Sequence, residues 1–302
     1  MTRLKHFYIF LEEVKKFFHQ QEFLEVYPPP LVQNPGMETH IHPFKVEDFA
    51  YYLATSPEFM LKKILTEEDI PSLYSLAYSF RNEPLSPIHR PQFLMLEFYS
   101  TKEHHYSYIQ SLCYDLVCLA SSFQGVEKPL FVKKTMAEIF QEVLQEDLKL
   151  LLSFDGLERY LKNHYPDLYN KKFSWEDSFF SLFLNVIEPY LQTFPFILID
   201  EFPKQLAALS QIKNEDYAYR FEIYSHGYEI ANGFLELQDL EEHKNRFHQQ
   251  NNAKQLLYNY SLPSPDDFYT TLEKGLPSCS GVAVGIERLY FSIKQEEHVF
   301  FE

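Results

Sequence analysis

The sequence is poor in glycine and cysteine, and it lacks the glycine-rich loops that many nucleotide-binding folds use. Only 8 of its 302 residues are glycine, and neither GxGxxG nor GxxxxGK[ST] occurs. We therefore do not expect a Rossmann or P-loop site. The three cysteines, Cys113, Cys118 and Cys279, fit no zinc spacing and are too few for a disulfide framework. They predict packing roles in a reducing compartment.

Positive charge and long apolar runs are also scarce. Lys and Arg total 27 against 43 Asp and Glu, and the resulting net charge of -16 opposes tight binding to a phosphate backbone. The apolar run at the N-terminus is too short for a signal peptide or a membrane span. The longest later apolar run, 194–199, has the length of a strand. We expect a soluble cytoplasmic protein without a membrane or nucleic-acid partner.

The chain does contain enough apolar residues for a large core, at 45% hydrophobic and 17% aromatic. Helical spacing predicts a first helix over 4–20, followed by a short strand that ends in prolines. Thr55-Ser-Pro-Glu58 is typical of a helix start, with its Thr or Ser as the cap. We predict an α+β fold of one domain over 1–302, with a mostly antiparallel sheet, flanking helices and a helical insertion over about 124–193.

The stretch 78–99 has two apolar arms joined by a segment with three prolines, Pro84, Pro87 and Pro91. Prolines prevent ladder pairing, so the pattern predicts two strands and a long loop. The polar and aromatic residues beside the loop could bind a phosphate, accept from an amino group and stack on a ring. These residues are Arg81, Glu83, His89, Arg90 and Phe93. A surface hairpin with ordinary charges would fit the same residues equally well.

Two glutamates flank a predicted hairpin turn at 226–227. Such a turn would pair Glu222 with Ala231 and place Glu222 and Glu229 diagonally on one face, about 7 to 8 Å apart. That separation suits two carboxylates that hold magnesium between them.

A third glutamate, Glu236, is an odd number of residues beyond Glu229 and would face away along a regular strand. A bulge at Gly233 could reset the alternation and return Glu236 to the shared face. The alternative is that all three glutamates face solvent on an outer sheet surface. Apolar neighbours argue for a site instead.

Two further features contain residues that could bind a ligand. Residues 278–288 read as a strand running into a helix, with Arg288 in the first helical turn, where a cation opposes the helix dipole and predicts an anionic partner. His40 and His42 share a face if extended, which allows either a metal pair or a structural or substrate-lining role.

Three segments resemble the signature motifs of class II aminoacyl-tRNA synthetases. Phe80-Arg81-x-Glu83 with His89 and Phe93 is similar to motif 2, and Gly285-Ile-Glu-Arg288 to motif 3. Pro29, after the first helix and strand, resembles motif 1, the dimer element. Thr55-Ser-Pro-Glu58, Leu96-Glu-Phe-Tyr99 and the stretch 229–236 are similar to the lysyl-tRNA synthetase branch.

The chain has one helix before motif 1, where lysyl-tRNA synthetases carry an anticodon-binding barrel. In this it resembles the family of free-standing paralogues that attach (R)-β-lysine to a lysine of translation elongation factor P. Ala283 supports this choice, since the synthetases have glycine there. Glu287 departs from the commoner Asp, Arg90 from the commoner Asn, and Pro84 stiffens the loop.

The resemblance implies an ATP-dependent, magnesium-dependent ligase that forms an aminoacyl-adenylate, acts as a homodimer and does not use tRNA. Arg81 and Arg288 would be catalytic. The ATP site would comprise Arg81, Asn82, Glu83, His89, Arg90, Phe93, Glu229, Ile230, Gly285 and Arg288. The amino-acid site would comprise Ser56, Pro57, Glu58, Glu97, Tyr99, Asn232, Glu236 and Ala283. Glu222 and Glu229 would bind Mg2+. Two alternatives are a truncated lysyl-tRNA synthetase that uses α-lysine and tRNA, and a catalytically silent regulatory paralogue.

Overall fold

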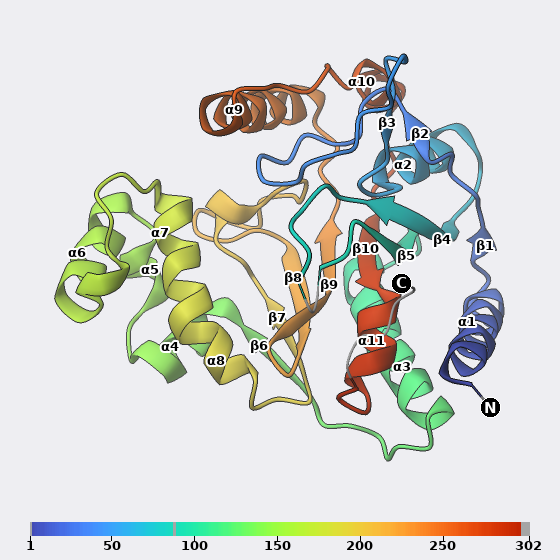
Figure 1. The fold of residues 1–302 in the computed structure, drawn as a ribbon, viewed down its shortest axis with the longest axis horizontal. Coiled ribbons are helices and arrows are strands. Elements are labelled where there is room, and N and C mark those ends of the chain that lie inside the picture. The colour runs from blue at the N-terminus through green and yellow to red at the C-terminus, as the bar shows by residue number, and fades with distance from the viewer. Residues whose placement is uncertain (1, 87–88, 297–302) are drawn as a thin grey trace. The chain divides into compact units, whose positions relative to one another are not determined.

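The computed structural model describes residues 2–86 and 89–296 (Figure 1). The chain divides into two compact units. The first unit comprises Met1–Glu127 and Glu236–Glu302, and the second comprises Lys128–Leu235. Pro87, the second loop proline, lies outside the described residues.

The strands of the first unit carry the predicted hairpin. β4 (Ser72–Phe80) and β5 (Gln92–Ser100) are antiparallel, as the apolar arms predicted. β10 (Ser280–Gly285) pairs antiparallel with β5, and β1 (Leu24–Glu25) pairs parallel with β4, which gives the order β1-β4-β5-β10. A separate antiparallel pair joins β2 (Leu31–Val32) to β3 (Tyr52–Leu53).

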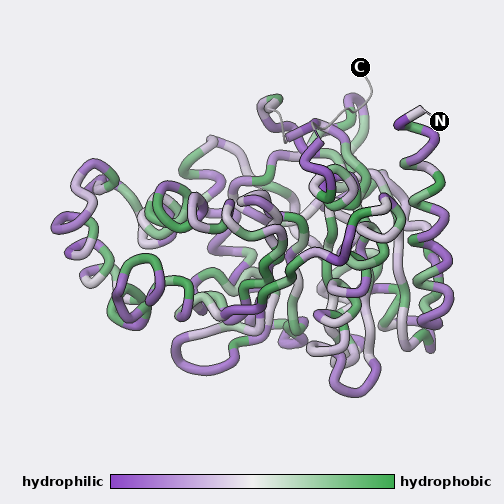
Figure 2. Tube along the Cα trace, turned by 90° about the horizontal axis from the view of Figure 1, so that it is seen from below, coloured by the Kyte–Doolittle hydropathy of each residue, from purple (hydrophilic) through white to green (hydrophobic). Residues whose placement is uncertain are grey.

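The helices of the first unit are α1 (Arg3–Gln20), α2 (Glu58–Glu67), α3 (His105–Phe123), α9 (Leu240–Tyr258), α10 (Asp266–Lys274) and α11 (Ile286–Ser292). The predicted first helix is confirmed: α1 buries Phe10, Val14 and Phe18 on one side, and its hydrophilic and hydrophobic residues alternate along the tube in Figure 2. The sequence did not predict α9. Its buried side chains include His243 and Lys254, so its pattern is weakly amphipathic.

The start of α2 differs from its predicted cap. Pro57 occupies the N-cap position without a side-chain hydrogen bond, and Glu58 is the first helical residue. The hydroxyl of Thr55 donates instead to the carbonyl of Pro35. Thr55 therefore ties the segment before the helix to a distant loop, and the prediction of a Thr or Ser cap was wrong.

The second unit contains four strands in the order β9-β8-β7-β6. β6 (Phe131–Thr135) pairs parallel with β7 (Phe196–Asp200), while β8 (Arg220–Ser225) pairs antiparallel with both β7 and β9 (Tyr228–Leu235). The sequence did not predict β6. Its two central lysines interrupt the apolar pattern that would have indicated a strand.

The predicted helical segment is confirmed between β6 and β7. It consists of α4 (Met136–Leu144), α5 (Leu148–Leu151), α6 (Phe154–His164), α7 (Trp175–Leu182), a π-helical turn (Phe183–Ile187) and α8 (Glu188–Leu191). Phe140, Phe179 and Leu182 pack in one buried core with Ile199 of β7 and Tyr224 of β8. The helices and strands of this unit thus share a single apolar interior.

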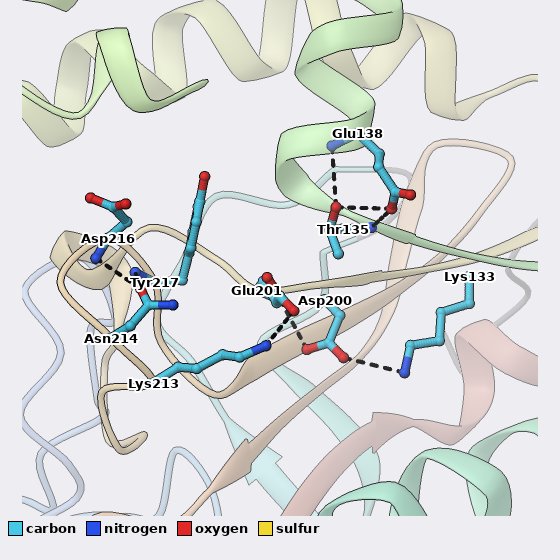
Figure 3. A network of polar contacts seen from close by, with 9 residues as sticks. All are labelled: Lys133, Thr135, Glu138, Asp200, Glu201, Lys213, Asn214, Asp216 and Tyr217. Atoms are coloured by element: carbon cyan, nitrogen blue, oxygen red, sulfur yellow. Dashed lines mark hydrogen bonds and ion pairs between the residues drawn. The ribbon is translucent and has the colours of Figure 1, made fainter. Parts of the chain in front are cut away.

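Polar contacts fix the junction of β6 and α4 (Figure 3). The hydroxyl of Thr135 accepts from the Glu138 N–H, and the Glu138 carboxylate accepts from the Thr135 N–H at 2.7 Å, which forms a capping box. Lys133 pairs with Asp200 at 3.3 Å, and Lys213 pairs with Glu201 at 2.5 Å. The ends of β6 and β7 are therefore tied at one edge of this sheet.

No helix in the described ranges 2–86 and 89–296 is long and apolar enough to cross a membrane.

Candidate active site

The β4–β5 hairpin presents three predicted site residues on one face. Phe93, Glu97 and Tyr99 lie opposite Ser79, Ser75 and Leu73 of β4, respectively. Because side chains alternate along a strand, Phe93, Glu97 and Tyr99 all point to the same side of the sheet.

Arg81 lies immediately after β4 and contacts Phe93. Its guanidinium carbon is 5.2 Å from the centre of the Phe93 ring, within the range of a cation–π contact. The Arg81 N–H donates to the carbonyl of Pro91 at 2.9 Å, which fixes the backbone at the base of the loop. Its Nε is buried and has no hydrogen-bond partner among the described residues. A buried, unmatched guanidinium N–H favours an anionic ligand at this point.

The loop beyond Arg81 is closed by its own polar contacts. His89 Nδ1 lies 2.9 Å from Ser86 Oγ, and the His89 N–H donates to the same oxygen at 3.0 Å. Burial lowers the pKa of His89, and the positive charge of Arg288 lowers it further. The charges of Glu83 and Arg288 thus both act on His89, within electrostatic range.

Two neighbouring loop residues have distinct surroundings. Asn82 is exposed, and its N–H donates to the carbonyl of His42 at 2.6 Å. Arg90 is half-buried, with a buried Nε that has no hydrogen-bond partner within the described parts of the chain. The structure thus gives Arg90, like Arg81, an unmatched donor.

Motif 3 starts α11. Gly285 is its N-cap, and a Cβ built on Gly285 would lie 3.5 Å from Cδ of Arg288. The stem of Arg288 therefore lies against Gly285 in the first turn of the helix. Glu287 is buried, and burial raises its pKa to about 7.

β10 is the strand next to β5, beside Glu97 and Tyr99. Ala283 lies directly opposite Glu97, and Gly281 lies opposite Tyr99. The hydroxyl of Tyr99 donates to Glu97 Oε1 at 2.6 Å, while Glu97 Oε2 is buried without a hydrogen-bond partner among the described residues. Burial raises the pKa of Glu97 well above its usual value, and the nearby charge of Glu58 adds to this. Binding of a cationic ligand beside Glu97 would therefore favour its ionised form and release its proton to solvent.

A buried lysine that the sequence did not predict completes the acidic pocket. Lys62 on α2 is fully buried, with its Nζ 2.5 Å from Glu58 Oε1 and 2.6 Å from Glu236 Oε2. Burial opposes its charge, but Glu236 and Glu58 outweigh burial and raise the pKa of Lys62. Burial also raises the pKa of Glu236, to about 7, although Lys62 opposes this. We use "the acidic pocket" for Glu58, Lys62, Glu97, Tyr99 and Glu236.

A cavity of about 270 Å³ lies beside the acidic pocket. Ser56, Pro57 and Glu58 line it, together with Glu38. Burial raises the pKa of Glu38, and the charge of Glu58 raises it further. Three of the predicted amino-acid-binding residues therefore border open space, which is a requirement for a ligand site.

The glutamate hairpin of the second unit has a different register from the one predicted. The turn at 226–227 is confirmed and Tyr224 pairs with Glu229, but Glu222 pairs with Asn232 rather than with the predicted Ala231. The cause is a bulge at Ile230, three residues before the predicted position at Gly233. Since the bulge adds one residue to β9, Glu222, Glu229 and Asn232 point to the same face.

The donor set of this hairpin suits magnesium. Glu222 is buried and accepts from Arg220 and, at 2.5 Å, from the Tyr224 hydroxyl, whereas Glu229 is exposed. Each oxygen of Glu222 keeps a second lone pair, so its present partners leave room for a metal ion. The Asn232 side-chain oxygen is buried without a hydrogen-bond partner in the described residues. No group of three or more His, Cys, Asp or Glu side chains able to hold a metal occurs within 2–86 and 89–296.

The two histidines considered for a metal pair have aromatic partners. His40 Nδ1 lies 2.8 Å from the Tyr258 hydroxyl, and His42 Nδ1 lies 2.6 Å from the Tyr260 hydroxyl. These contacts, which tie the loop to α9 and its C-terminal end, favour the structural role.

Comparison with known proteins gives a consistent result. A family model described as tRNA synthetases class II (D, K and N) matches residues 1–300. A Klebsiella pneumoniae protein named elongation factor P--(R)-beta-lysine ligase is 32% identical over 294 residues, covering 92% of this chain and 87% of the relative. Proteins with the same name from Salmonella dublin and Proteus mirabilis are 32% and 29% identical, with the same coverage of both chains.

Proposed function

Because the chain belongs to the class II tRNA synthetases (D, K and N), we propose that it activates (R)-β-lysine with ATP and transfers it to a lysine of translation elongation factor P. The acidic pocket carries this proposal. A substrate with two ammonium groups needs carboxylate partners for both before either can leave water. Glu58, Glu97 and Glu236 supply three buried or nearly buried carboxylates.

The first step joins the substrate carboxylate to AMP. A carboxylate oxygen attacks the α-phosphorus, the bond from that phosphorus to the β-phosphate oxygen breaks, and pyrophosphate leaves. Arg81 would neutralise the charge that develops at the α-phosphate, because its Nε lacks a partner beside the Phe93 ring. Such a reaction depends mainly on positioning and charge neutralisation.

The remaining nucleotide contacts follow the family resemblance. We propose that Phe93 stacks on the adenine, that Glu83 and the backbone near Asn82 and Ile230 contact its edge, and that Gly285 lets the ligand approach the backbone. His89, Arg90 and Arg288 would bind the β- and γ-phosphates. His89 is neutral near pH 7, since burial and Arg288 lower its pKa, so it would donate one hydrogen bond rather than a full charge.

Glu222 and Glu229 would hold Mg2+, which would neutralise charge on the phosphates when bound. In this chain Arg220 and Tyr224 fix the orientation of the Glu222 carboxylate. Asn232, on the same face, would accept a hydrogen bond from the substrate through its unpartnered oxygen.

The second step transfers the acyl group. The neutral amine of the acceptor lysine attacks the carbonyl carbon of the adenylate, the bond to the phosphate oxygen breaks, and AMP leaves with an amide bond formed. Translation elongation factor P as acceptor would place the reaction in the cytoplasm.

A homodimer is also part of the proposal. α1 exposes Leu4, Tyr8 and Ile9, at 44%, 49% and 37%, and the chain just after it exposes Leu24 and Tyr27. Such a row of apolar side chains beside the motif 1 proline supports an interface with a second copy. Light scattering should give twice the chain mass, and a monomer at micromolar concentration would contradict this part.

The test offers two amino acids and two acceptors. Purified protein receives ATP, Mg2+ and either (R)-β-lysine or α-lysine, with elongation factor P and tRNA supplied separately. We expect amino-acid-dependent ATP–pyrophosphate exchange with (R)-β-lysine and a mass gain of one aminoacyl group on elongation factor P. Charged tRNA would instead support a truncated lysyl-tRNA synthetase, and absence of all turnover would support a silent paralogue.

A further inference from the structure

Lys62 has no part in the function proposed so far, although it is among the largest fully buried side chains of the described structure. We propose that Lys62 determines specificity as a positioning residue: its ammonium ion bridges Glu58 and Glu236, so that the pocket, once its three carboxylates are ionised, has a net charge of two negative units and selects a ligand with two ammonium groups. This inference rests on the proposed function and concerns the same site.

The geometry places one cation between two carboxylates from distant parts of the chain. Glu58 lies one helical turn before Lys62 on α2, and Glu236 follows β9. Oxygens of both lie within 2.6 Å of the same nitrogen. Lys62 therefore fixes the distance between the two carboxylates. Without it, their like charges would repel or one would take up a proton.

The other groups around Lys62 do not replace its charge. His243 on α9 is held neutral, since burial and the charge of Lys62 lower its pKa to about 3. Phe268 on α10 presents its ring 5.8 Å from Lys62 Nζ. Glu97 and Tyr99 on β5 and Cys279 before β10 complete the titratable surroundings, and burial raises the pKa of each.

The number of charged groups in the acidic pocket explains the expected preference for a diamino acid. Three carboxylates, Glu58, Glu97 and Glu236, face one resident ammonium. When all three are ionised, two further positive charges restore neutrality, which is the number on a diamino acid at neutral pH. A monoamine would leave one buried carboxylate unmatched or protonated, and either state costs free energy.

A purely space-filling residue would not need this chemistry. Burial of a lysine and a glutamate often stabilises a fold no better than apolar side chains of similar volume. A methionine would fill the same length without the desolvation of an ammonium ion. The ion pair is thus explained by what it does to the pocket rather than by stability.

The experiment compares Lys62→Met with a control, Lys16→Met, which changes an exposed lysine of α1 outside the acidic pocket and its cavity. Calorimetry measures dissociation constants without ATP for (R)-β-lysine, 6-aminohexanoate and 3-aminohexanoate. The two monoamines each lack one of the ammonium groups. Circular dichroism checks that each variant is folded.

In the wild type and in Lys16→Met, we expect the diamine to bind about a hundredfold more tightly than either monoamine. In Lys62→Met that ratio should fall at least about tenfold at pH 7, because Glu236 would lose the charge of Lys62, take up a proton and no longer prefer an ammonium. Equal weakening for all three ligands would mean that Lys62 only supports the fold, and would overturn the inference.

A second pair of measurements covers the case in which Lys62→Met does not fold. Lys62→Ala is assayed with added n-propylammonium, which replaces the missing side-chain atoms, and with 1-propanol as the uncharged counterpart. The inference expects the ligand ratio to recover with the cation alone, and equal recovery or no recovery with both overturns it. A wild type that binds none of the three amino acids would instead sink the proposed function.

Discussion

The ring of Tyr99 lies so close to Gly281 that no side chain fits between them. A Cβ built on Gly281 would stand 2.1 Å from Cε1 of Tyr99, far inside van der Waals contact. The two residues are direct partners across β5 and β10. Glycine is therefore required at position 281 to let the Tyr99 hydroxyl reach Glu97 at 2.6 Å.

Gly281→Ala should displace the Tyr99 ring and raise KM for the amino acid more than it lowers kcat. Overpacking of this kind costs about 1 to 3 kcal/mol, which urea unfolding would detect. In a Tyr99→Ala background the same alanine should cost much less, because the clash is gone. Additive costs in the double variant would show that another contact is responsible.

Arg81→Ala should abolish ATP–pyrophosphate exchange while the protein remains folded. Loss of one donor to developing charge typically costs about 3 to 4 kcal/mol, or two to three orders of magnitude in rate. Arg81→Lys should recover little, since an ammonium lacks the planar fork. The exposed Arg159 on α6 provides the control, and Arg159→Ala should retain full exchange. Near-normal exchange by Arg81→Ala would reject its assigned role.

Much of the fold could be predicted because its elements have strong local signals. The hairpin arms of β4 and β5, the helix α1 and the capping box at Thr135 each follow from alternation, helical spacing or a short polar motif. α9 and β6 were missed because polar residues interrupt their patterns. Tertiary contacts, rather than local sequence, stabilise those elements.

The candidate site was predictable as far as its motifs extend. The motifs drew attention to Arg81, Phe93, Glu97 and Tyr99, and the structure places the last three on one face of β5, with Arg81 against the Phe93 ring. Lys62 was missed because a lysine that is followed by a second lysine on a helix normally reaches solvent. The one available signal was its position four residues after Glu58, which is also the spacing of an ordinary surface ion pair. The bulge at Ile230 has no local marker at all, so the register of Glu222 was wrong by one residue.

Replacement of Glu287 should alter the pH dependence of stability. Burial raises the pKa of Glu287 to about 7, so the folded state holds a proton that the unfolded chain loses near its ordinary value. Its contribution to the free energy of unfolding is therefore fully present at low pH and is lost as pH rises to about 7. Glu287→Gln should remove this slope and stabilise the protein at pH 8 by up to about 3 kcal/mol.

The control for Glu287→Gln is Glu273→Gln, which neutralises an exposed glutamate near the end of α10. Thermal unfolding from pH 5 to pH 8 should give a profile for this control that runs parallel to the wild type. If the Glu287→Gln profile also runs parallel, Glu287 is ionised in the folded protein throughout this range.

Amino-acid binding should release protons from the acidic pocket. Burial raises the pKa of Glu236 to about 7 and raises that of Glu97 well above its usual value, so the empty pocket is partly protonated at neutral pH. Ammonium groups stabilise the ionised carboxylates, and affinity should therefore increase as pH rises from about 6 to about 8, by roughly tenfold for one proton over one pH unit.

Calorimetry in buffers of different ionisation enthalpy measures the protons released. Glu236→Gln should bind more weakly and release fewer protons, while Glu273→Gln should match the wild type. A proton count of zero in the wild type would mean that the carboxylates are already ionised and that Lys62, with Tyr99, neutralises the empty pocket more completely than burial opposes it.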